Sequence, residues 1–245
     1  MRTYGIIGFP LGHSFSQTYF TEKFRKEGIG DCVYRNFPLP SIHELAQLLI
    51  DNKELEGFNV TIPYKQLILD HLHDTANIPP GLQACNCVKI VDGKLTGYNT
   101  DITGFERSLY PLLEDHHTHA LILGNGGAAA AVRFVLKKLN IPYGIVSREL
   151  HDGSTLTYAD LDEAIITKHK LIINTTPLGT FPEPDHCPGI PYQFLSNRHL
   201  LYDLVYNPSK TLFLQKGEER GAAVKNGYEM LLIQAEESWR IWNEC

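Results

Sequence analysis

Ala120-Leu-Ile-Leu-Gly124-Asn-Gly126-Gly127-Ala128-Ala129-Ala-Ala-Val132 begins as an apolar run, passes through a glycine-rich turn and continues as an alanine-rich segment to Leu139. The pattern predicts a β-strand, a tight turn and the start of a helix. Gly124, Gly126 and Ala129 occupy the small-residue positions of a dinucleotide-binding fingerprint. In that motif the first glycine allows the turn, the second lets the backbone approach a pyrophosphate, and the third small residue packs helix on strand. An ordinary α/β protein can contain a similar glycine turn, but this context favours phosphate binding at the helix N-terminus.

The composition limits the function classes that need to be considered. At 245 residues the chain can form one large or two modest domains, and 43% hydrophobic with 20% charged residues is typical of a globular protein. The net charge of −6 argues against a general nucleic-acid binder. No apolar run approaches the roughly 18 residues of a membrane-spanning helix, and the glycine-broken start is too short for a cleavable signal. The cysteines are odd in number and Cys85-Asn-Cys87 lacks zinc-ligand spacing, so we expect free thiols, no metal and a reducing cytoplasm.

Strand and helix patterns alternate along almost the whole chain, which predicts an α/β fold with mostly parallel sheet. Pro63 is expected to open a helix, and Asp92-Gly93 is expected to form a hairpin turn. The expected strands cover residues 4–9, 32–37, 57–61, 84–91, 94–98, 120–123, 143–146, 171–174 and 200–204. The expected helices cover residues 15–26, 42–50, 101–113, the segment that ends at 139, and 230–242.

Three segments indicate how the elements are organised into domains. The helix from about residue 101 to 113, followed by the polar segment Glu114-Asp-His-His-Thr-His119, is expected to connect two domains. The proline-rich stretch from Pro177 to Pro191 is a long loop, and such loops are often functional. The final helix is amphipathic and aromatic, so it must bury its apolar face, and we expect it to pack on the first domain.

Two polar clusters lie where strands end or helices begin, the edge at which open α/β sheets bind ligands. In the first, the hydroxyls of Ser14 and Ser16 could hold a carboxylate, although Ser16 could equally be the N-cap of the next helix. In the second, Asn59-Val-Thr61-Ile-Pro-Tyr-Lys65, the lysine falls in the first turn of the helix expected at Pro63. The positive end of a helix dipole disfavours an ammonium there, which suits a group that donates and accepts a proton. A solvated surface lysine is the alternative.

Two further polar residues complete the candidate site. Asn86, between two cysteines, is either a satisfied strand residue or a donor and acceptor for a hydroxylated ligand. Asp101, after Asn99 and Thr100, falls near a helix N-terminus, where capping is the alternative role. A carboxylate placed against Lys65 would oppose the dipole, keep the ammonium charged and orient it. We therefore expect Lys65 and its partner Asp101 to lie together and to face the reactive ring of a bound dinucleotide across an interdomain gap.

Two other patterns suggest chemistry but favour ordinary roles. Tyr19-Phe-Thr-Glu-Lys23 matches the Tyr-x-x-x-Lys of short-chain dehydrogenases, but there the motif follows the nucleotide fingerprint, whereas here it precedes it. We interpret Tyr19 and Lys23 as helix residues without a catalytic part. His116, His117 and His119 sit in a polar segment, where a solvated loop is a better interpretation than a metal site.

Taken together, these motifs resemble the shikimate dehydrogenase family over nearly the full chain. They occur in the order of that family: Ser14-Phe-Ser16, Asn59-Val-Thr-Ile-Pro-Tyr-Lys65, Asn86, Gly97-Tyr-Asn-Thr-Asp101, Gly124-Asn-Gly-Gly-Ala128, Asn174-Thr-Thr-Pro177-Leu-Gly179, Tyr202-Asp-Leu-Val-Tyr206-Asn-Pro208 and Met230-Leu-Leu-Ile-Gln234. The resemblance implies a cytoplasmic enzyme, monomer or homodimer, that reversibly reduces 3-dehydroshikimate to shikimate with NADPH in aromatic amino acid biosynthesis. It also implies a substrate-binding domain of residues 1–102 completed by 228–245, and a Rossmann-like dinucleotide-binding domain of residues 103–227.

The resemblance assigns roles to individual residues. It implies that Lys65 is the catalytic acid and base, with Asp101 as its partner, and that both contact the substrate. It implies that Ser14 and Ser16 hold the substrate carboxylate. The other implied substrate-binding residues are Asn59, Thr61, Asn86, Tyr206 and Gln234. The implied cofactor-binding residues are Gly124, Asn125, Gly126, Gly127, Ala128, Ser147, Arg148, Leu204 and Gly227.

The sequence departs from the family pattern at two places. Many members carry two arginines after the strand that follows the fingerprint helix, whereas here only Arg148 is present and Glu149 follows it. Ser147 and Arg148 can bind a 2′-phosphate and Glu149 repels one, so NADP is favoured and NAD is possible. Glu229 stands where the family often has glycine, and it either narrows the nicotinamide pocket or points to solvent.

Three alternative functions follow. The first is a quinate/shikimate dehydrogenase that prefers NAD. The second is a catalytically silent nucleotide-binding regulator of the same fold, which would need neither Lys65 nor Asp101. The third is a bifunctional folate dehydrogenase of related architecture, which Ser14, Ser16 and Gln234 do not support.

Overall fold

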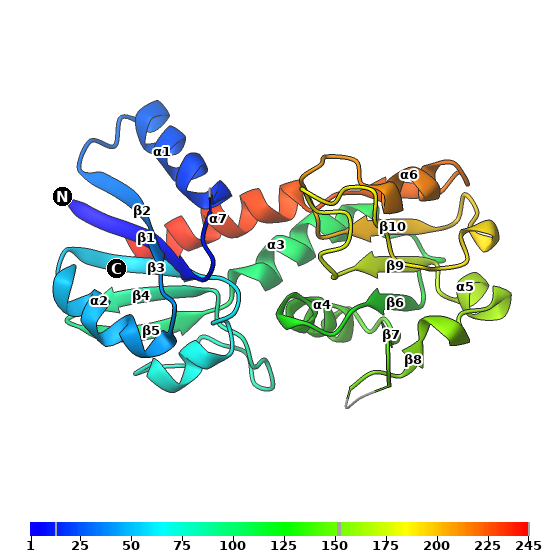
Figure 1. The fold of residues 1–245 in the computed structure, drawn as a ribbon, viewed down its shortest axis with the longest axis horizontal. Helices are drawn as coiled ribbons and strands as arrows, with labels where there is room; N and C mark the ends of the chain where they lie inside the picture. The colour runs from blue at the N-terminus through cyan, green and yellow to red at the C-terminus, as the bar shows by residue number, and fades with distance from the viewer. Residues whose placement is uncertain (13, 151–152, 245) are drawn as a thin grey trace. The chain divides into compact units, whose positions relative to one another are not determined.

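The computed structural model describes residues 1–12, 14–150 and 153–244, and the chain divides into two compact α/β units (Figure 1). The first unit consists of Met1–Thr100 and Ala235–Cys245, and the second consists of Asp101–Gln234. The expected α/β fold with two domains is confirmed.

The first unit contains a five-stranded mixed sheet in the order β2-β1-β3-β4-β5. Its strands are β1 (Arg2–Gly8), β2 (Cys32–Pro38), β3 (Leu55–Val60), β4 (Cys87–Val91) and β5 (Lys94–Tyr98). β1 pairs in parallel with β2 and β3, whereas β4 pairs antiparallel with β3 and β5. Asp92 and Gly93 both have positive φ, 50° and 74°, as a two-residue hairpin turn requires. The predicted hairpin is confirmed, but its first strand begins at Cys87 and not at Ala84.

The helices of the first unit begin at hydroxyl caps. Ser14 is the N-cap of α1 (Phe15–Glu27), and its Oγ accepts a hydrogen bond from Gln17 N at 3.2 Å. Ser16 therefore lies inside the helix and is not the cap. Ser41 caps the next segment as expected, but the helix expected at 42–50 starts with a 3-10 turn, η1 (Ile42–Glu44), before α2 (Leu45–Asp51).

The expected helix at Pro63 is wrong. Residues 62–66 form a turn, and only a short 3-10 helix, η2 (Leu67–His71), follows. Thr61 N donates to Ile7 O at 3.0 Å and Lys65 O accepts from Cys85 N at 2.7 Å, so this backbone bonds to neighbouring segments instead of forming its own helical ladder. Lys65 consequently lies in the turn, and the argument from a helix dipole does not apply to it.

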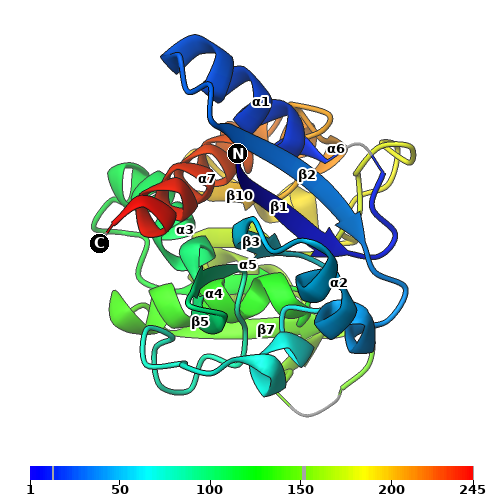
Figure 2. The same ribbon diagram turned by 90° about the vertical axis from the view of Figure 1, so that its left-hand side faces the viewer.

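The C-terminal part of α7 (Tyr228–Asn243) completes the core of the first unit, as expected for this amphipathic helix (Figure 2). The Trp242 ring stacks on Tyr4 with centroids 4.9 Å apart, and its Nε1 donates to Val88 O at 3.0 Å. The backbone of Gly57 lies directly under this ring, since a Cβ there would be 2.4 Å from Trp242 Cδ1. The helix also packs against α1, with the Phe24 and Trp239 rings 5.1 Å apart.

The second unit contains a six-stranded, fully parallel sheet in the order β11-β10-β9-β6-β7-β8. Its strands are β6 (Ala120–Leu123), β7 (Tyr143–Ser147), β8 (Leu156–Thr157), β9 (Leu171–Asn174), β10 (Leu200–Asp203) and β11 (Ala223–Lys225). Counted from β6, this is the strand order 3-2-1-4-5-6 of the Rossmann fold, whose ligands bind where the order reverses, between the first and fourth strands. β6, β9 and β10 are buried throughout, as expected for parallel strands covered on both faces.

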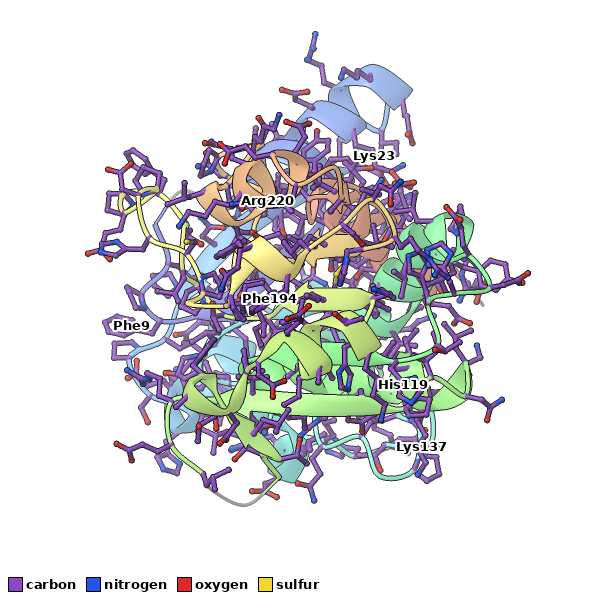
Figure 3. All side chains as sticks on the ribbon, turned by 90° about the vertical axis from the view of Figure 1, so that its right-hand side faces the viewer. Phe9, Lys23, His119, Lys137, Phe194 and Arg220 are labelled. Atoms are coloured by element: carbon purple, nitrogen blue, oxygen red, sulfur yellow. The ribbon has the colours of Figure 1, made fainter. Side chains whose placement is uncertain are left out.

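The helices of this unit include two that the sequence patterns missed (Figure 3). They are α3 (Thr100–Leu109), α4 (Gly127–Lys138), α5 (Glu163–Lys168) and α6 (Leu212–Glu218), to which α7 adds its first residues. α5 and α6 were not predicted, and neither were the short strands β8 and β11. The helix expected to reach residue 113 ends at Leu109 and continues as the 3-10 turn η3 (Tyr110–Leu112), which contains a proline that cannot donate a helical hydrogen bond.

Two further expectations can be compared with the described residues. Cys32, Cys87 and Cys187 are free thiols, as predicted, while Cys245 lies outside the described residues. Within the described part of the chain, no helix combines the length and apolar character needed to span a membrane.

Candidate active site

A chain of buried hydrogen bonds runs through the first unit. The Ser16 hydroxyl lies beside that of Tyr34, and Tyr34 donates to Asn59 Oδ1 at 2.8 Å. Burial raises the pKa of Tyr34 well above its ordinary value, so the phenol stays protonated and remains a donor. Asn59 Nδ2 then donates to Ser238 Oγ at 2.9 Å, which lies 3.3 Å from Thr100 Oγ1. The chain therefore connects α1, β2, β3, α7 and the first residue of α3.

Asn86 continues this chain and joins it to the turn that carries Lys65. Its carboxamide is bound at both ends to Thr100: Nδ2 donates to Oγ1 at 3.0 Å, and Oδ1 accepts from the backbone N at 2.6 Å. Its backbone O accepts from Val60 N at 2.9 Å and from Asn59 Nδ2 at 3.2 Å. The preceding residue, Cys85, donates its backbone N–H to Lys65 O. The structure thus brings Asn59, Lys65 and Asn86 together where β3 ends.

The start of α1 holds the two predicted serines in different ways. Ser16 is buried in the chain just described, whereas Ser14 donates to Asn36 Oδ1 at 2.6 Å. Asn36 Nδ2 donates onward to Gln17 Oε1 at 2.9 Å. Thr61, also predicted, directly follows β3 against Gly8, where a Cβ would lie 2.4 Å from Thr61 Cγ2.

In the second unit, the glycine turn has the geometry expected of the fingerprint. Gly124 has φ +100°, and a Cβ there would lie 2.9 Å from Thr176 Cγ2, so a larger residue would be both strained and crowded. A Cβ on Gly126 or Gly127 would meet nothing within 4 Å, which leaves open space at the start of α4. Gly126 is the N-cap and has no side chain that could cap the first N–H groups of α4. This arrangement fits a pyrophosphate, which would occupy that space.

The fingerprint's remaining residues also have the expected positions. Ala129 is fully buried, as helix-on-strand packing requires, while Ala128 in the first turn is half-buried. Asn125 Oδ1, between the two glycines, accepts from Arg133 Nη1 at 2.7 Å. The predicted strand, turn and helix are therefore confirmed as a structural unit.

Ser147 and Arg148 lie at the carboxyl end of β7, beside the glycine turn. Gly124 N donates to Val146 O at 2.8 Å, which places the two strand ends together. Ser147 is buried and its Oγ donates to Glu149 O at 2.6 Å, whereas the Arg148 and Glu149 side chains are exposed. The residues that follow, His151 and Asp152, lie outside the described residues.

Leu204 and Gly227, two predicted cofactor residues, are packed together. A Cβ on Gly227 would lie 2.2 Å from Leu204 O, so only glycine fits, and Gly227 N donates to Val205 O at 3.1 Å. Asp203, just before Leu204, holds this segment. Its Oδ1 accepts from Val205 N at 3.0 Å and Asn174 Nδ2 at 2.9 Å, and its Oδ2 from Thr211 Oγ1 at 2.6 Å. Burial raises the pKa of the Asp203 carboxyl to about 6.

The other predicted substrate residues of this unit lie on three elements. Asp101 is buried in the first turn of α3, inside the helix and not at its cap. Tyr206 follows Asp203 and is 37% exposed. Gln234 is buried on α7, and its Nε2 donates to Leu231 O at 3.0 Å. Gly104 lets α3 approach α7 here, since a Cβ would lie 2.6 Å from Met230 O.

The structure also shows the residues for which the sequence favoured a role without catalysis or metal binding. Tyr19 and Lys23 lie on α1 and both bond to Glu236 of α7, the Lys23 ammonium at 2.8 Å. His117 is buried and not solvated, and its Nδ1 accepts from Glu114 N at 2.9 Å. No group of three or more potential metal ligands occurs among the described residues. Glu229 is half exposed and pairs with Lys225, so it points to solvent.

Sequence reasoning missed Tyr34, Asn36, Ser238 and Arg133. Ser238 alone had a local signal, because it interrupts an otherwise apolar and aromatic helix face at the spacing of Ala235 and Trp242. The other three contact their partners only through the tertiary fold.

The fold and this arrangement define a class of proteins: two-domain α/β proteins whose second domain is of the Rossmann type. Residues 6–88 match the family model described as the shikimate dehydrogenase substrate binding domain. The chain belongs to the shikimate dehydrogenase family.

Individual relatives span almost all of the chain. Shikimate dehydrogenase (NADP(+)) of Methanothermobacter thermautotrophicus is 33% identical over 97% of this chain and 89% of its own. The crystal structure of a chorismate mutase/shikimate 5-dehydrogenase fusion protein from Clostridium acetobutylicum is 32% identical with a TM-score of 0.86, over 99% of this chain and 91% of that one. The crystal structure of shikimate 5-dehydrogenase from Thermus thermophilus in complex with NADP(H) and shikimate is 27% identical with a TM-score of 0.86, over 99% of this chain and 94% of that one.

Proposed function

We propose that this protein is a shikimate dehydrogenase that reversibly reduces 3-dehydroshikimate to shikimate with NADPH, in the cytoplasm and in the aromatic biosynthetic pathway. The observation that carries the proposal is that buried hydrogen bonds join Asn59 and Asn86 at the end of β3, and that Cys85, next to Asn86, holds the backbone of Lys65. Such a chain holds polar groups in one orientation before a ligand arrives, which reduces the entropic cost of binding. The relatives' activity supports the same reaction.

In this proposal each of the two units binds a different ligand. The first unit, completed by α7, binds the substrate, and the match of residues 6–88 to the substrate binding domain supports this. The second unit binds the cofactor at the glycine turn, with its pyrophosphate in the open space beside Gly126 and Gly127. Ser147 and Arg148 face the 2′-phosphate, and Leu204 and Gly227 pack against the nicotinamide end.

The chemistry then assigns each polar residue a task. When bound, NADPH supplies the hydride for the substrate carbonyl carbon, and the C=O π electrons move onto the oxygen. The Lys65 ammonium donates a proton to this oxygen, which stabilises its developing charge, and takes it back in the reverse direction. Asp101 holds the ammonium and orients it.

The remaining predicted residues bind and orient the ring. Ser14 and Ser16 hold the substrate carboxylate. For Ser14 this requires its one O–H to turn from Asn36 Oδ1 to the ligand. The hydroxyl groups are held by Asn59, Thr61, Asn86, Tyr206 and Gln234. Because hydrogen-bonded sites reject analogues that leave buried polar groups unpaired, this set favours shikimate over less hydroxylated ring acids.

A spectrophotometric assay of shikimate oxidation with NADP+ and NAD+ in parallel tests the proposal, with quinate as a second substrate. We expect NADPH formation from shikimate and a higher kcat/KM with NADP+. No turnover of shikimate with either cofactor would refute the proposal and favour a silent nucleotide-binding regulator. A preference for NAD+, which the exposed Glu149 would favour, would identify the alternative quinate/shikimate dehydrogenase. Light scattering of the same preparation distinguishes monomer from homodimer.

A further inference from the structure

Arg133 on α4 reaches back to the glycine turn. Its Nη1 donates to Asn125 Oδ1 at 2.7 Å, although the two residues are two helical turns apart. Helical side chains lean towards the N-terminus of their helix, so an arginine at this position extends in the direction of the turn. Arg133 as a whole is half-buried.

The loop after β7 returns to the same place. Gly153 has φ +89°, and a Cβ there would lie 3.3 Å from Asn125 Nδ2 and 4.0 Å from Arg133 Nη1. The turn after β6, the second turn of α4 and the loop after β7 thus surround one position beside Asn125. A side chain larger than glycine at residue 153 would approach the guanidinium.

The local charges favour an anion at this position. Among the described residues, neither Arg133 nor Arg148 forms an ion pair with a carboxylate. Arg133 uses one N–H to donate to Asn125 Oδ1, and a guanidinium has five N–H donors in a planar fork that matches phosphate oxygens.

The position of the adenosine ribose in Rossmann folds indicates which anion would bind beside Asn125. In Rossmann folds the adenosine ribose lies near the end of the second strand, about 20 residues after the fingerprint, where an acidic residue selects NAD and an arginine accommodates the 2′-phosphate of NADP. Here that strand is β7, which ends at Ser147 and is followed by Arg148. The segment offers a single arginine, and Glu149 beside it opposes a phosphate dianion.

We propose that Arg133 is a cofactor-specificity residue, which supplies from α4 a second guanidinium for the 2′-phosphate and offsets Glu149. The inference rests on the proposed function and extends it to the choice between NADP and NAD. Asn125 positions the guanidinium through its carboxamide. The ligand class is a nucleotide that carries a 2′-phosphate.

The test compares the binding of two nucleotide fragments by isothermal titration calorimetry: 2′,5′-ADP, which carries the 2′-phosphate, and 5′-ADP, which does not. The variants are Arg133→Gln, Arg133→Lys and the exposed control Arg220→Gln, a residue labelled in Figure 3. We expect Arg133→Gln to raise the Kd of 2′,5′-ADP by about tenfold or more and to change that of 5′-ADP less than about twofold. Arg133→Lys retains the charge and should fall between the two, and Arg220→Gln should match the wild type.

Steady-state kinetics provide the second measurement. For Arg133→Gln, kcat/KM should fall for NADP+ and not for NAD+, with kcat for NADP+ changed less than about twofold. Equal changes for both fragments, or no change for either, would overturn the inference while leaving shikimate oxidation by the wild type intact. Wild-type protein that binds 2′,5′-ADP through Arg133 but does not oxidise shikimate would refute the proposed function alone. Wild-type protein that binds neither fragment would refute the inference as well.

Discussion

Asn59 Nδ2 and Ser238 Oγ are hydrogen-bonded at 2.9 Å, although 179 residues separate them in the chain. One lies on β3 beside the turn that carries Lys65, and the other on the C-terminal helix. The last residues of the chain therefore help to hold a candidate substrate residue near its start. Both groups are buried, so leaving either unpaired would cost free energy.

Tyr34→Phe is expected to weaken substrate binding selectively. The change removes the donor to Asn59 Oδ1, so this predicted substrate residue loses a fixed orientation. One neutral hydrogen bond contributes about 1 kcal/mol, so KM for shikimate should rise about fivefold and that for NADP+ should not change. The free energy of unfolding should fall by about 1–3 kcal/mol, because a buried acceptor loses its donor.

The matched control is Tyr110→Phe, since Tyr110 is 65% exposed. Initial-rate kinetics with each substrate varied in turn make the measurement, and urea unfolding monitors stability. If the two KM values rose together, Tyr34 would be a general structural residue and not one that positions substrate groups.

Lys65→Ala is expected to reduce turnover by about two to four orders of magnitude, the usual contribution of general acid–base catalysis. Cofactor binding should remain, because the glycine turn belongs to the other unit. Lys94→Ala, which removes an exposed lysine of the same unit, is the control. The measurements are kcat for shikimate oxidation and the Kd of NADP+. Turnover near that of the wild type would exclude Lys65 from the proton transfer.

Asp203→Asn is expected to change the pH dependence of stability. Burial raises the folded-state pKa of this carboxyl from 3.8 to about 6, so folding favours the protonated form. The contribution of the Asp203 carboxyl to stability is therefore fully present below pH 3.8. It is lost as the pH rises through 6, because the folded protein must then hold the charged carboxylate in its interior. Asparagine stays neutral. The difference in unfolding free energy, variant minus wild type, should therefore increase as the pH rises from about 4 to about 7.5. The increase should be up to about 3 kcal/mol, at roughly 1.36 kcal/mol for each pKa unit.

Urea unfolding of both proteins at the two pH values gives this difference directly. Asp185→Asn, at an exposed position of the same unit, should show no such change. A difference between Asp203→Asn and the wild type that does not vary with pH would mean that the carboxyl does not titrate in this range.

His117→Asn is expected to make the protein less sensitive to acid. Burial, together with the neighbouring His116, lowers the pKa of His117 below 6.5, so the folded state favours the neutral ring. The ring's contribution to stability is present above about pH 6.5 and is lost as the pH falls below it, because the unfolded chain takes up the proton first. The asparagine carboxamide can still accept from Glu114 N but does not titrate.

The midpoint of thermal unfolding at about pH 7.5 and about pH 5.5 measures the effect. It should fall more in the wild type than in His117→Asn, while the exposed His186→Asn control should behave as the wild type. Burial also lowers the pKa of His169 and His199, so the variant should retain part of the acid sensitivity. Identical shifts in all three proteins would contradict the prediction.

Local sequence patterns were enough to predict the fold class. The alternation of strand and helix, the turn at Asp92-Gly93 and the glycine turn at Gly124 each depend on the conformational preferences of neighbouring residues. The same reasoning failed at Pro63. There the backbone of Thr61 and Lys65 forms hydrogen bonds with Ile7 and Cys85, which are remote in sequence, and these bonds compete with a helix. The short elements α5, α6, β8 and β11 were missed because so few residues give a weak periodic signal.

The candidate site shows the same division. Residue type and motif order in this sequence were sufficient to single out Lys65, Asn86 and the glycine turn. Only the tertiary structure decided that Tyr34 and Ser238 hold Asn59, and that Gly153 lies against Asn125 and Arg133. The physical reason is that a hydrogen bond acts over about 3 Å, and only the folded chain sets the distance between partners on different elements.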